Sequence, residues 1–296
     1  MGLAFGKDLL PEMNSRKLLV GLLLALVVTS LLGLNVVEAQ KSIAANTRPF
    51  EPVEELFYEA EFNRALLRGL DVAEFKLRSV RAPVTAEADR QVGKSYSLTF
   101  NADVTSKGFF TRLFNLKFRE QIESSVEGHS FTLQKTTILD EQGKRVRATE
   151  TTYDRSIGKM SWHQRDPNNP DAEPRHSIVD FTGQLQDVLS AIYYIRTQQL
   201  QVGKTFDVFI GESGHVYRVP IKVVEKKSMK SVLGKVKTVC VEPQLFGPGN
   251  MLENEKGQFS LWITDDDRRI PVSAKIKTEY GIFDVKLKRV VNNPPA

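Results

Sequence analysis

The feature that most constrains the fold of this chain is an alternation of apolar and polar residues that recurs along most of its length. In SYSLTFNADV, residues 95–104, every second side chain is apolar, from Tyr96 to Val104. A period of two is typical of a strand with one buried face. The pattern recurs in AEFKLRS, KTFDVFI, VYRVPIKVV, FSLWI, PVSAKIKT and IFDVKLKRV. We expect about a dozen strands, mostly antiparallel because the connections are short.

One segment has a different period. Residues 180–200, DFTGQLQDVLSAIYYIRTQQL, place apolar side chains at spacings of three and four, at Leu185, Val188, Leu189, Ile192 and Ile195. This spacing predicts an amphipathic helix of about four turns, which has to bury its apolar side against a sheet. The predicted fold class is therefore mainly β with one long helix (α+β): a curved antiparallel sheet or partly open β-barrel covered by that helix.

The N-terminal residues resemble an export signal. Arg16 and Lys17 precede an uncharged apolar run, residues 18–34, and the small residues Val37 and Ala39 follow it. This order predicts a signal peptide over residues 1–39, cleaved after Ala39. The alternative is an uncleaved membrane anchor, because the run is close to the roughly 20 residues that cross a bilayer. Either alternative predicts a protein of the periplasm or cell envelope, anchored in the inner membrane if the segment is retained.

The rest of the chain is expected to form one domain. Residues 40–53 contain two prolines and predict a flexible lead-in, residues 54–291 a single β-rich domain, and residues 292–296 a tail. A proline-rich stretch at residues 166–176 predicts an exposed loop between candidate halves 54–164 and 178–291. Two packed domains are the alternative to a single one.

Charge and cysteine content exclude several classes of protein. The 41 Lys and Arg residues are offset by 36 Asp and Glu residues, which leaves a net charge of +5 without a dense basic block. This argues against a nucleic-acid partner. The single cysteine, Cys240, excludes an intramolecular disulfide and lies in an alternating run, KVKTVCVEP. A buried small hydrophobic residue is expected there, in place of a nucleophile.

No catalytic or cofactor motif is convincing. Ser213 lies near His215 in GESGH but lacks the spacing of a nucleophile elbow, and SIGK, residues 156–159, has no supporting partner motif. The four histidines are far apart, at His129, His163, His176 and His215. Phosphate-binding and dinucleotide-binding glycine patterns do not occur. We expect no enzyme activity, no cofactor and no metal.

Three consecutive aspartates, Asp265, Asp266 and Asp267, invite a metal-site interpretation. Carboxylates bind hard cations, but a calcium loop needs ligands at alternating positions and a glycine at the bend, whereas Arg268 and Arg269 follow here. We favour the structural alternative, in which the aspartates cap amides in the turn of a hairpin.

The aromatic residues are the better candidates for a binding site. Most aromatic side chains belong to the core, but some could line an apolar cavity between the sheet and the helix, where curved sheets bind lipids. The candidate lining residues are Phe109, Phe110, Phe114, Leu189, Ile192, Tyr193 and Trp262.

Two blocks resemble a known family. The two blocks, DVLSAIYYIRTQQLQVGKTF and LWITDDDRRIPVSAKIKTEYGIFDVKL, are similar to the bacterial envelope family called domain of unknown function 3108. Weaker similarity extends through EELFYEAEF and from SLTFNADV to TTYDR, so the resemblance covers nearly all of the expected mature chain. The resemblance implies an exported, β-dominated protein and brings no established active site. The architecture is more loosely similar to periplasmic lipoprotein carriers, and a fold alone does not determine function.

Three functions are compatible with these observations. The first is a noncatalytic envelope protein that binds an apolar or amphipathic ligand, such as a lipid or a lipoprotein acyl chain, between sheet and helix. The second is a scaffold or assembly factor that binds an envelope protein or glycan through its surface. The third is a hydrolase whose site is assembled from distant residues. Membrane contact is expected only through an uncleaved N-terminal segment.

Overall fold

A single hydrogen-bonded sheet contains all the named strands. The computed structural model describes residues 50–65, 67–83, 96–108, 117–253 and 255–292. The first half of the sheet comprises β1 (Val53–Arg64), β2 (Leu67–Pro83), β3 (Tyr96–Ser106), β4 (Phe118–Glu127), β5 (Thr132–Gln142), β6 (Arg145–Asp154), β7 (Lys159–Arg165) and β8 (Arg175–Asp180). The second half comprises β9 (Leu185–Gln186), β10 (Thr205–Glu212), β11 (His215–Ser231), β12 (Gly234–Pro243), β13 (Gly257–Thr264), β14 (Pro271–Thr278) and β15 (Gly281–Asn292).

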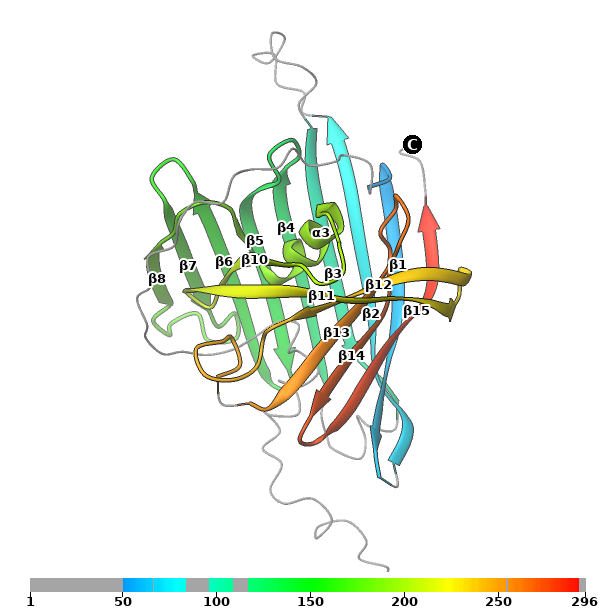
Figure 1. Ribbon diagram of the computed structural model, residues 1–296. Helices are drawn as coiled ribbons and strands as arrows, with labels where there is room; N and C mark the ends of the chain where they lie inside the picture. The colour runs from blue at the N-terminus through cyan, green and yellow to red at the C-terminus, as the bar shows by residue number, and fades with distance from the viewer. Residues whose placement is uncertain (1–49, 66, 84–95, 109–116, 254, 293–296) are drawn as a thin grey trace, which may run out of the picture.

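Strands β1 to β8 follow one another from the middle of the sheet to one edge, and β9 to β15 follow one another from the other edge back to the middle. The 15-stranded sheet has the order β8-β7-β6-β5-β4-β3-β2-β1-β15-β14-β13-β12-β11-β10-β9. Every neighbouring pair is antiparallel except β9 and β10, which are parallel. The sheet is strongly curved, so the second half faces the first across the interior (Figure 1). The predicted curved, mainly antiparallel sheet is confirmed.

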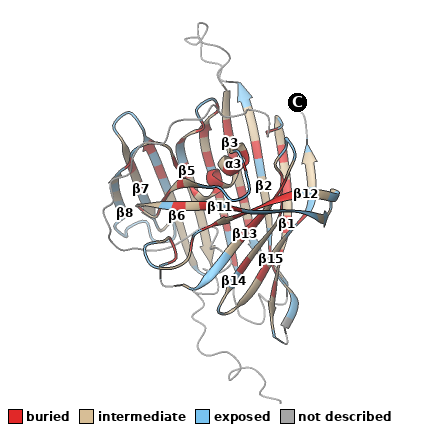
Figure 2. Ribbon diagram, viewed as in Figure 1, coloured by how far each residue is buried: buried red, intermediate tan, exposed pale blue. Residues whose placement is uncertain are grey.

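The alternation in sequence becomes an alternation in burial. Along β1 the inward positions from Glu54 to Phe62 are buried, while their neighbours are half-buried. β3 and β4 show the same two-residue period, and Figure 2 shows the buried positions as bands on the strands around the interior. Burying apolar side chains on one face is the main favourable term for such a sheet.

The helix is shorter than the sequence predicts. The helix α3 spans Val188–Thr197, ten residues, and not residues 180–200. Asp187 ends the preceding extended segment: its carboxylate accepts from the Ser190 amide at 2.6 Å, and the Ser190 hydroxyl accepts from the Asp187 amide at 3.0 Å. This reciprocal cap begins the helix at Val188. Leu185, which matches the helical spacing, instead lies in β9 and pairs with Phe209.

α3 lies inside the curve of the sheet and is buried on two sides (Figures 1 and 2). Leu189 and Tyr193 pack into an apolar cluster formed mainly by β1 to β7. Ala191 and Ile195 pack into a second cluster formed mainly by β10 to β13. The predicted covering of the concave face by a helix is therefore confirmed, and the helix joins the two halves of the sheet.

Several predictions concern residues outside this description. The signal or anchor segment, most of the lead-in, Phe109, Phe110 and Phe114, and the tail beyond Asn292 lie outside the described residues. Over the described ranges, no helix has the length and apolar character that a membrane span requires. The predicted loop at residues 166–176 is shorter, because β8 already begins at Arg175.

Candidate functional site

The predicted lining residues fall into two separate regions. Leu189 and Tyr193 are buried in the cluster between α3 and the first half of the sheet, and Ile192 is half-buried. Trp262 lies on the face of β13 opposite to Leu261, so it packs against a different cluster, which contains Leu56, Tyr58, Ile270, Val272 and Leu287. The structure therefore brings Leu189 and Tyr193 together and leaves Trp262 apart from them.

The space between α3 and β3 is filled by aromatic rings. Phe100 and Tyr193 stack with ring centroids 4.0 Å apart and planes at 6°. Phe50 lies 5.9 Å from each of these rings, and Phe131 lies 5.8 Å from Phe100. Such stacked and tilted contacts are typical of a packed core. The cavity expected at Tyr193 is therefore occupied by the protein's own side chains.

A buried ion pair continues this packed region. Arg196 Nη1 donates to Glu54 Oε1 at 2.6 Å and Nη2 donates to Glu54 Oε2 at 3.0 Å, with both side chains almost fully buried. Nη2 also donates to the Arg268 carbonyl oxygen at 2.9 Å, and the guanidinium lies 5.2 Å from the centre of the Phe50 ring. This pair fixes the C-terminal end of α3 against β1.

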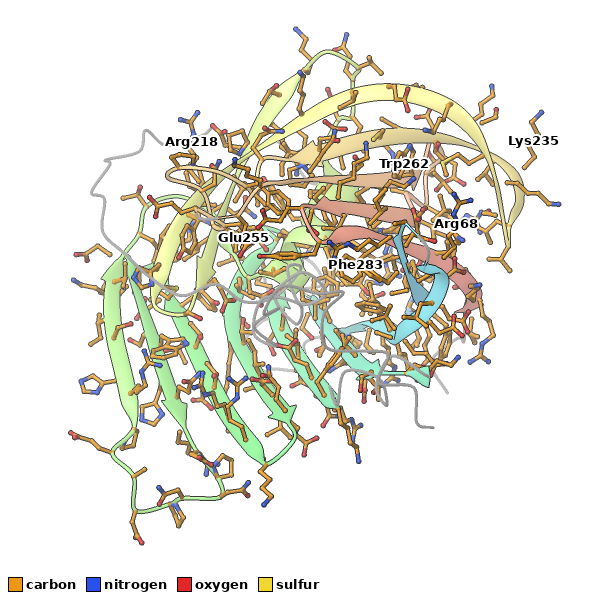
Figure 3. The ribbon with its side chains drawn as sticks, turned by 90° about the horizontal axis from the view of Figure 1, so that it is seen from below. Arg68, Arg218, Lys235, Glu255, Trp262 and Phe283 are labelled. Carbon is orange, nitrogen blue, oxygen red and sulfur yellow. The ribbon has the colours of Figure 1, made fainter. Side chains whose placement is uncertain are left out.

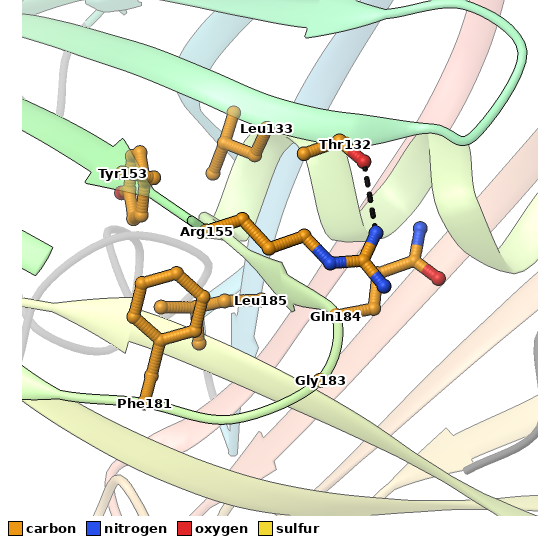
Figure 4. A pocket seen from close by; sticks show the side chains of 8 residues that line it. All are labelled: Thr132, Leu133, Tyr153, Arg155, Phe181, Gly183, Gln184 and Leu185. Carbon is orange, nitrogen blue, oxygen red and sulfur yellow. Dashed lines mark hydrogen bonds between the residues drawn. The ribbon is translucent and has the colours of Figure 1, made fainter. Parts of the chain in front are cut away.

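A small pocket opens where the chain crosses from β8 to β9. Its empty volume is about 220 Å³, including the part open to solvent. Figure 4 shows its wall, formed by Thr132, Leu133, Tyr153, Arg155, Phe181, Gly183, Gln184 and Leu185. Leu133, Phe181 and Leu185 are buried apolar side chains. The pocket therefore has an apolar floor.

Arg155 gives this pocket a cationic rim. Its side chain is exposed, and Nη1 donates to Thr132 Oγ1 at 3.3 Å (Figure 4). Among the described residues, no carboxylate lies within ion-pair distance of this guanidinium. An apolar floor beside an unneutralised cation is suited to a molecule with an apolar body and a negative head.

The pocket is connected to the beginning of α3 by polar side chains. Tyr153, in the pocket wall, has its hydroxyl 3.3 Å from Thr136 Oγ1, and Thr136 in turn donates to the Asp187 carboxylate. Asp187 is the residue that caps α3. Burial raises the pKa of Tyr153 well above its usual value, and the nearby Asp187 charge raises this pKa further. The pocket wall and the helix N-terminus therefore share one hydrogen-bonded chain.

Two buried carboxyl groups lie on the same interior face. Burial raises the pKa of Glu212 to about 7, and the Ser213 hydroxyl, which donates to Glu212 Oε1 at 2.8 Å, opposes this shift. Burial also raises the pKa of Glu120 well above its usual value, reinforced by Asp140. Neither carboxyl oxygen of Glu120 has a hydrogen-bond partner among the described residues. Perturbed carboxyls of this kind occur at functional sites and in structural networks alike.

The catalytic and metal candidates are not assembled into a site. Ser213 donates to Glu212, while His215 Nδ1 lies 3.1 Å from the Ser213 carbonyl oxygen instead of its hydroxyl. Within the described ranges, no three or more His, Cys, Asp or Glu side chains are grouped so that they could hold a metal ion.

The three aspartates lie in the turn between β13 and β14. Asp266 accepts from Thr264 Oγ1 at 2.6 Å and from the Arg269 amide at 3.1 Å. Asp265 pairs with Lys226 at 2.7 Å. The carboxylates of Asp265 and Asp266 are thus engaged with the protein's own donors.

The pocket residues were missed by sequence reasoning because they come from three separate stretches. Arg155 follows β6, Thr132 and Leu133 begin β5, and Phe181 to Leu185 belong to the crossover. A local signal existed for Glu120, which occupies an inward position of β4 between the buried Phe118 and Ile122. A carboxyl group at a position where the alternation predicts a buried apolar side chain indicates a buried ionisable group, which is unusual in a protein core.

Comparison with known proteins identifies the family, and a search of solved structures finds matches of low sequence identity. No curated protein matches this chain. A crystal structure described as a beta-barrel-like protein of domain of unknown function DUF1849, from Brucella abortus, is similar with a TM-score of 0.46 and 10% identity, covering 82% of this chain and 98% of that one. Residues 59–288 match the family described as "Protein of unknown function (DUF3108)", so the chain belongs to that family.

Proposed function

We propose that this chain is an exported, noncatalytic envelope protein that binds an amphipathic anion, such as a free fatty acid with its carboxylate or a lipid with an anionic headgroup. The observation that carries the proposal is the Arg155 guanidinium, which has no carboxylate partner among the described residues and lies beside the apolar wall of Leu133, Phe181 and Leu185. The basic and apolar N-terminal segment, residues 16–34, supports export.

The proposed site differs from the one expected between the sheet and α3. The rings of Phe100 and Tyr193 fill that space, whereas the pocket at the crossover is open to solvent. The space inside this pocket is only about 10 Å³, close to what one water molecule needs, whereas sites that enclose drug-sized ligands have roughly 300–1,000 Å³. A ligand would therefore lie over the mouth of the pocket, with its apolar part against the rim and its negative group at Arg155.

Native mass spectrometry of protein purified from its own envelope tests this proposal. We expect co-purifying amphipathic anions, which a fluorescent fatty acid should displace. Arg155→Gln should weaken binding of the fatty acid by about tenfold or more, because a charge-assisted contact is lost. Arg165→Gln is the matched control, because Arg165 is also exposed and lies outside the pocket wall. Absence of both co-purifying ligand and fatty-acid binding would exclude the proposal.

A second candidate function has its own supporting observation. β8 (Arg175–Asp180) is an outer strand of the sheet, and among the described strands it pairs only with β7. Its central Ile178 is 67% exposed. An open strand edge with an exposed apolar side chain is suited to pairing with an extended segment of another protein, as expected of an envelope scaffold.

Substitution by proline distinguishes this scaffold function from ligand binding. Ile178→Pro should abolish capture of a partner that pairs with β8, because proline removes a backbone donor, while Ile178→Ser should retain backbone pairing. Pull-down from envelope extract followed by binding of the fatty acid separates the two functions. Equal capture by both variants would exclude pairing at the β8 edge.

A further inference from the structure

The hairpin that joins β11 to β12 extends past the rest of the sheet. β12 pairs with β13 only from Thr238 to Val241, whereas β11 and β12 continue to pair as far as Ser231 and Gly234. Residues 226–237, which we call the lysine hairpin, therefore form a two-stranded projection. Figures 1 and 3 show it curving around the side of the sheet, near β1 and β15.

The two faces of the lysine hairpin have opposite character. Met229 and Val236 are directly opposite each other on the inner face, and Val236 and Leu233 pack against the cluster around Tyr58 and Val272. The outer face carries exposed lysines at Lys226, Lys230, Lys235 and Lys237. The apolar contacts of the hairpin with the rest of the fold are therefore made by its inner face.

The lysines of the outer face are poorly neutralised. Lys226 pairs with Asp265 at 2.7 Å. Within the part of the chain that the structure describes, Lys230, Lys235 and Lys237 have no carboxylate within ion-pair distance. Lys230 lies directly opposite Lys235 across the two strands, and like charges in this arrangement destabilise a sheet. Figure 3 shows Lys235 pointing outward at the end of the hairpin.

The tip adds an apolar side chain to this cationic face. Val232, in the turn between the strands, is 52% exposed. A basic surface that ends in an exposed apolar side chain is suited to a bilayer with negatively charged headgroups, where the cations meet phosphates and the apolar tip enters the interface. The hairpin contains no arginine and no aromatic residue, whereas proteins that bind single-stranded nucleic acid use aromatic stacking.

From this geometry we propose that the lysine hairpin is a docking surface for an anionic phospholipid bilayer. Lys230, Lys235 and Lys237 supply the electrostatic attraction, and Val232 inserts at the level of the headgroups. This surface is independent of the pocket at Arg155 and of any membrane contact through the N-terminal segment. It would orient the protein with the β11–β12 end towards the membrane.

The chain offers a direct optical test of this surface. Its single cysteine, Cys240, is buried, and burial raises the pKa of its thiol to about 12. A Val232→Cys substitution in the full chain therefore creates one accessible thiol for an environment-sensitive dye. We expect a blue shift of the dye with vesicles of phosphatidylcholine and phosphatidylglycerol, no shift with phosphatidylcholine alone, and reversal at high salt, because surface charges are screened.

Lysine substitutions in the labelled chain identify the source of the attraction. Lys230→Gln, Lys235→Gln and Lys237→Gln together should lower the apparent affinity for the mixed vesicles by about a hundredfold, since each lysine near an anionic surface contributes about fivefold. The matched control changes three exposed lysines elsewhere, Lys144, Lys204 and Lys277, to Gln. Because every variant keeps residues 18–34, insertion of that segment does not explain a difference between them.

The outcomes that overturn the proposal are specific. The proposal is overturned if the dye spectrum does not respond to phosphatidylglycerol in the vesicles. It is also overturned if the control triple variant loses as much affinity as the hairpin variant, or if the hairpin variant keeps the full response. A response to a single-stranded oligonucleotide without a response to vesicles would assign the lysines to nucleic acid instead. Far-ultraviolet circular dichroism of each variant establishes that the fold is retained.

Discussion

Arg196 and Glu54 form a doubly hydrogen-bonded ion pair between α3 and β1, with side-chain exposures of 0% and 2%. The two residues are 142 positions apart in the chain. α3 packs against both halves of the sheet, and this pair fixes the C-terminal end of the helix to β1, the first described strand. Two charges removed from water in this way stabilise a fold only while both are present.

Removing one member of this pair should therefore be costly. We expect Glu54→Gln or Arg196→Met alone to lower the free energy of unfolding by roughly 3–5 kcal/mol, because the remaining charge is buried without its partner. The double variant Glu54→Leu with Arg196→Met should recover most of this loss. Urea unfolding followed by fluorescence measures the change.

An exposed ion pair provides the control for this prediction. Lys135 and Glu150 lie 2.8 Å apart with side-chain exposures of 46% and 54%. Glu150→Gln should change stability by no more than about 1 kcal/mol, since exposed pairs are screened by solvent. Similar losses at Glu54 and Glu150 would contradict the assigned importance of burial.

The stability of the protein should depend on pH through Glu212. Burial raises the pKa of Glu212 from 4.5 to about 7, so the folded state binds a proton that the unfolded state releases between these values. The free energy of unfolding should therefore fall as the pH rises through this window, by an amount on the order of 3 kcal/mol from Glu212 alone. Glu120, whose pKa burial also raises, should add to this fall. Glu212→Gln should remove this part of the pH dependence.

Urea unfolding midpoints below and above this pH window measure the effect. Glu173→Gln is the control, because Glu173 is an exposed residue of the loop between β7 and β8. The assignment to Glu212 fails if the Glu212→Gln variant retains the wild-type pH profile.

In the aspartate turn, replacement of Asp266 should destabilise the fold, whereas replacement of Asp267 should not. Asp266→Ala should destabilise the fold by about 0.5–2 kcal/mol, because Asp266 accepts from Thr264 Oγ1 and from the Arg269 amide. Asp267 is exposed, and Asp267→Ala should have an effect within about 0.5 kcal/mol. Calcium should not raise the melting temperature of either variant or of the wild type. A calcium-dependent increase that is lost in both variants would restore the metal-site interpretation.

Cys240 should report unfolding through its reactivity. Its side chain is 2% exposed and burial raises the pKa of the thiol to about 12, so the reactive thiolate is scarce in the folded protein. We expect negligible reaction with a thiol reagent under native conditions and complete reaction in urea. The urea dependence of the reaction should follow the loss of fluorescence from the tryptophans. Rapid labelling without denaturant would show that β12 opens locally.

The strands were predictable because their signal is local. Tyr96 to Val104 alternate in sequence, and β3 begins at Tyr96 as expected. The helix boundary was not predicted correctly, since Leu185 matches the helical spacing but pairs with β10. Asp187 carried the missing information, because an aspartate three residues before a serine can form a reciprocal cap.

The candidate pocket was beyond the reach of periodicity. Arg155 and Phe181 come together only because β8 ends at one edge of the sheet and the chain crosses back to β9 over β5 and β6. A two-residue period predicts the face of the sheet on which a side chain lies. It does not predict which distant strand lies on the opposite side of the interior. Tyr193 was expected to line a cavity for the same reason: the helix face on which it lies was predictable, but its stacking on Phe100 was not.

The order of the strands also determines when the fold can be completed. β1 pairs with β15, so the centre of the sheet is built from the first and last described strands, while its two edges, β8 and β9, are consecutive in the chain. During synthesis, which starts at the N-terminus, the edge of β1 that pairs with β15 remains unpaired until β15 has been made. Contacts between such distant segments form slowly and leave strand edges exposed to aggregation. Joining the ends and cutting between β8 and β9 would remove this one distant pairing, so that each named strand would pair only with its neighbours in sequence.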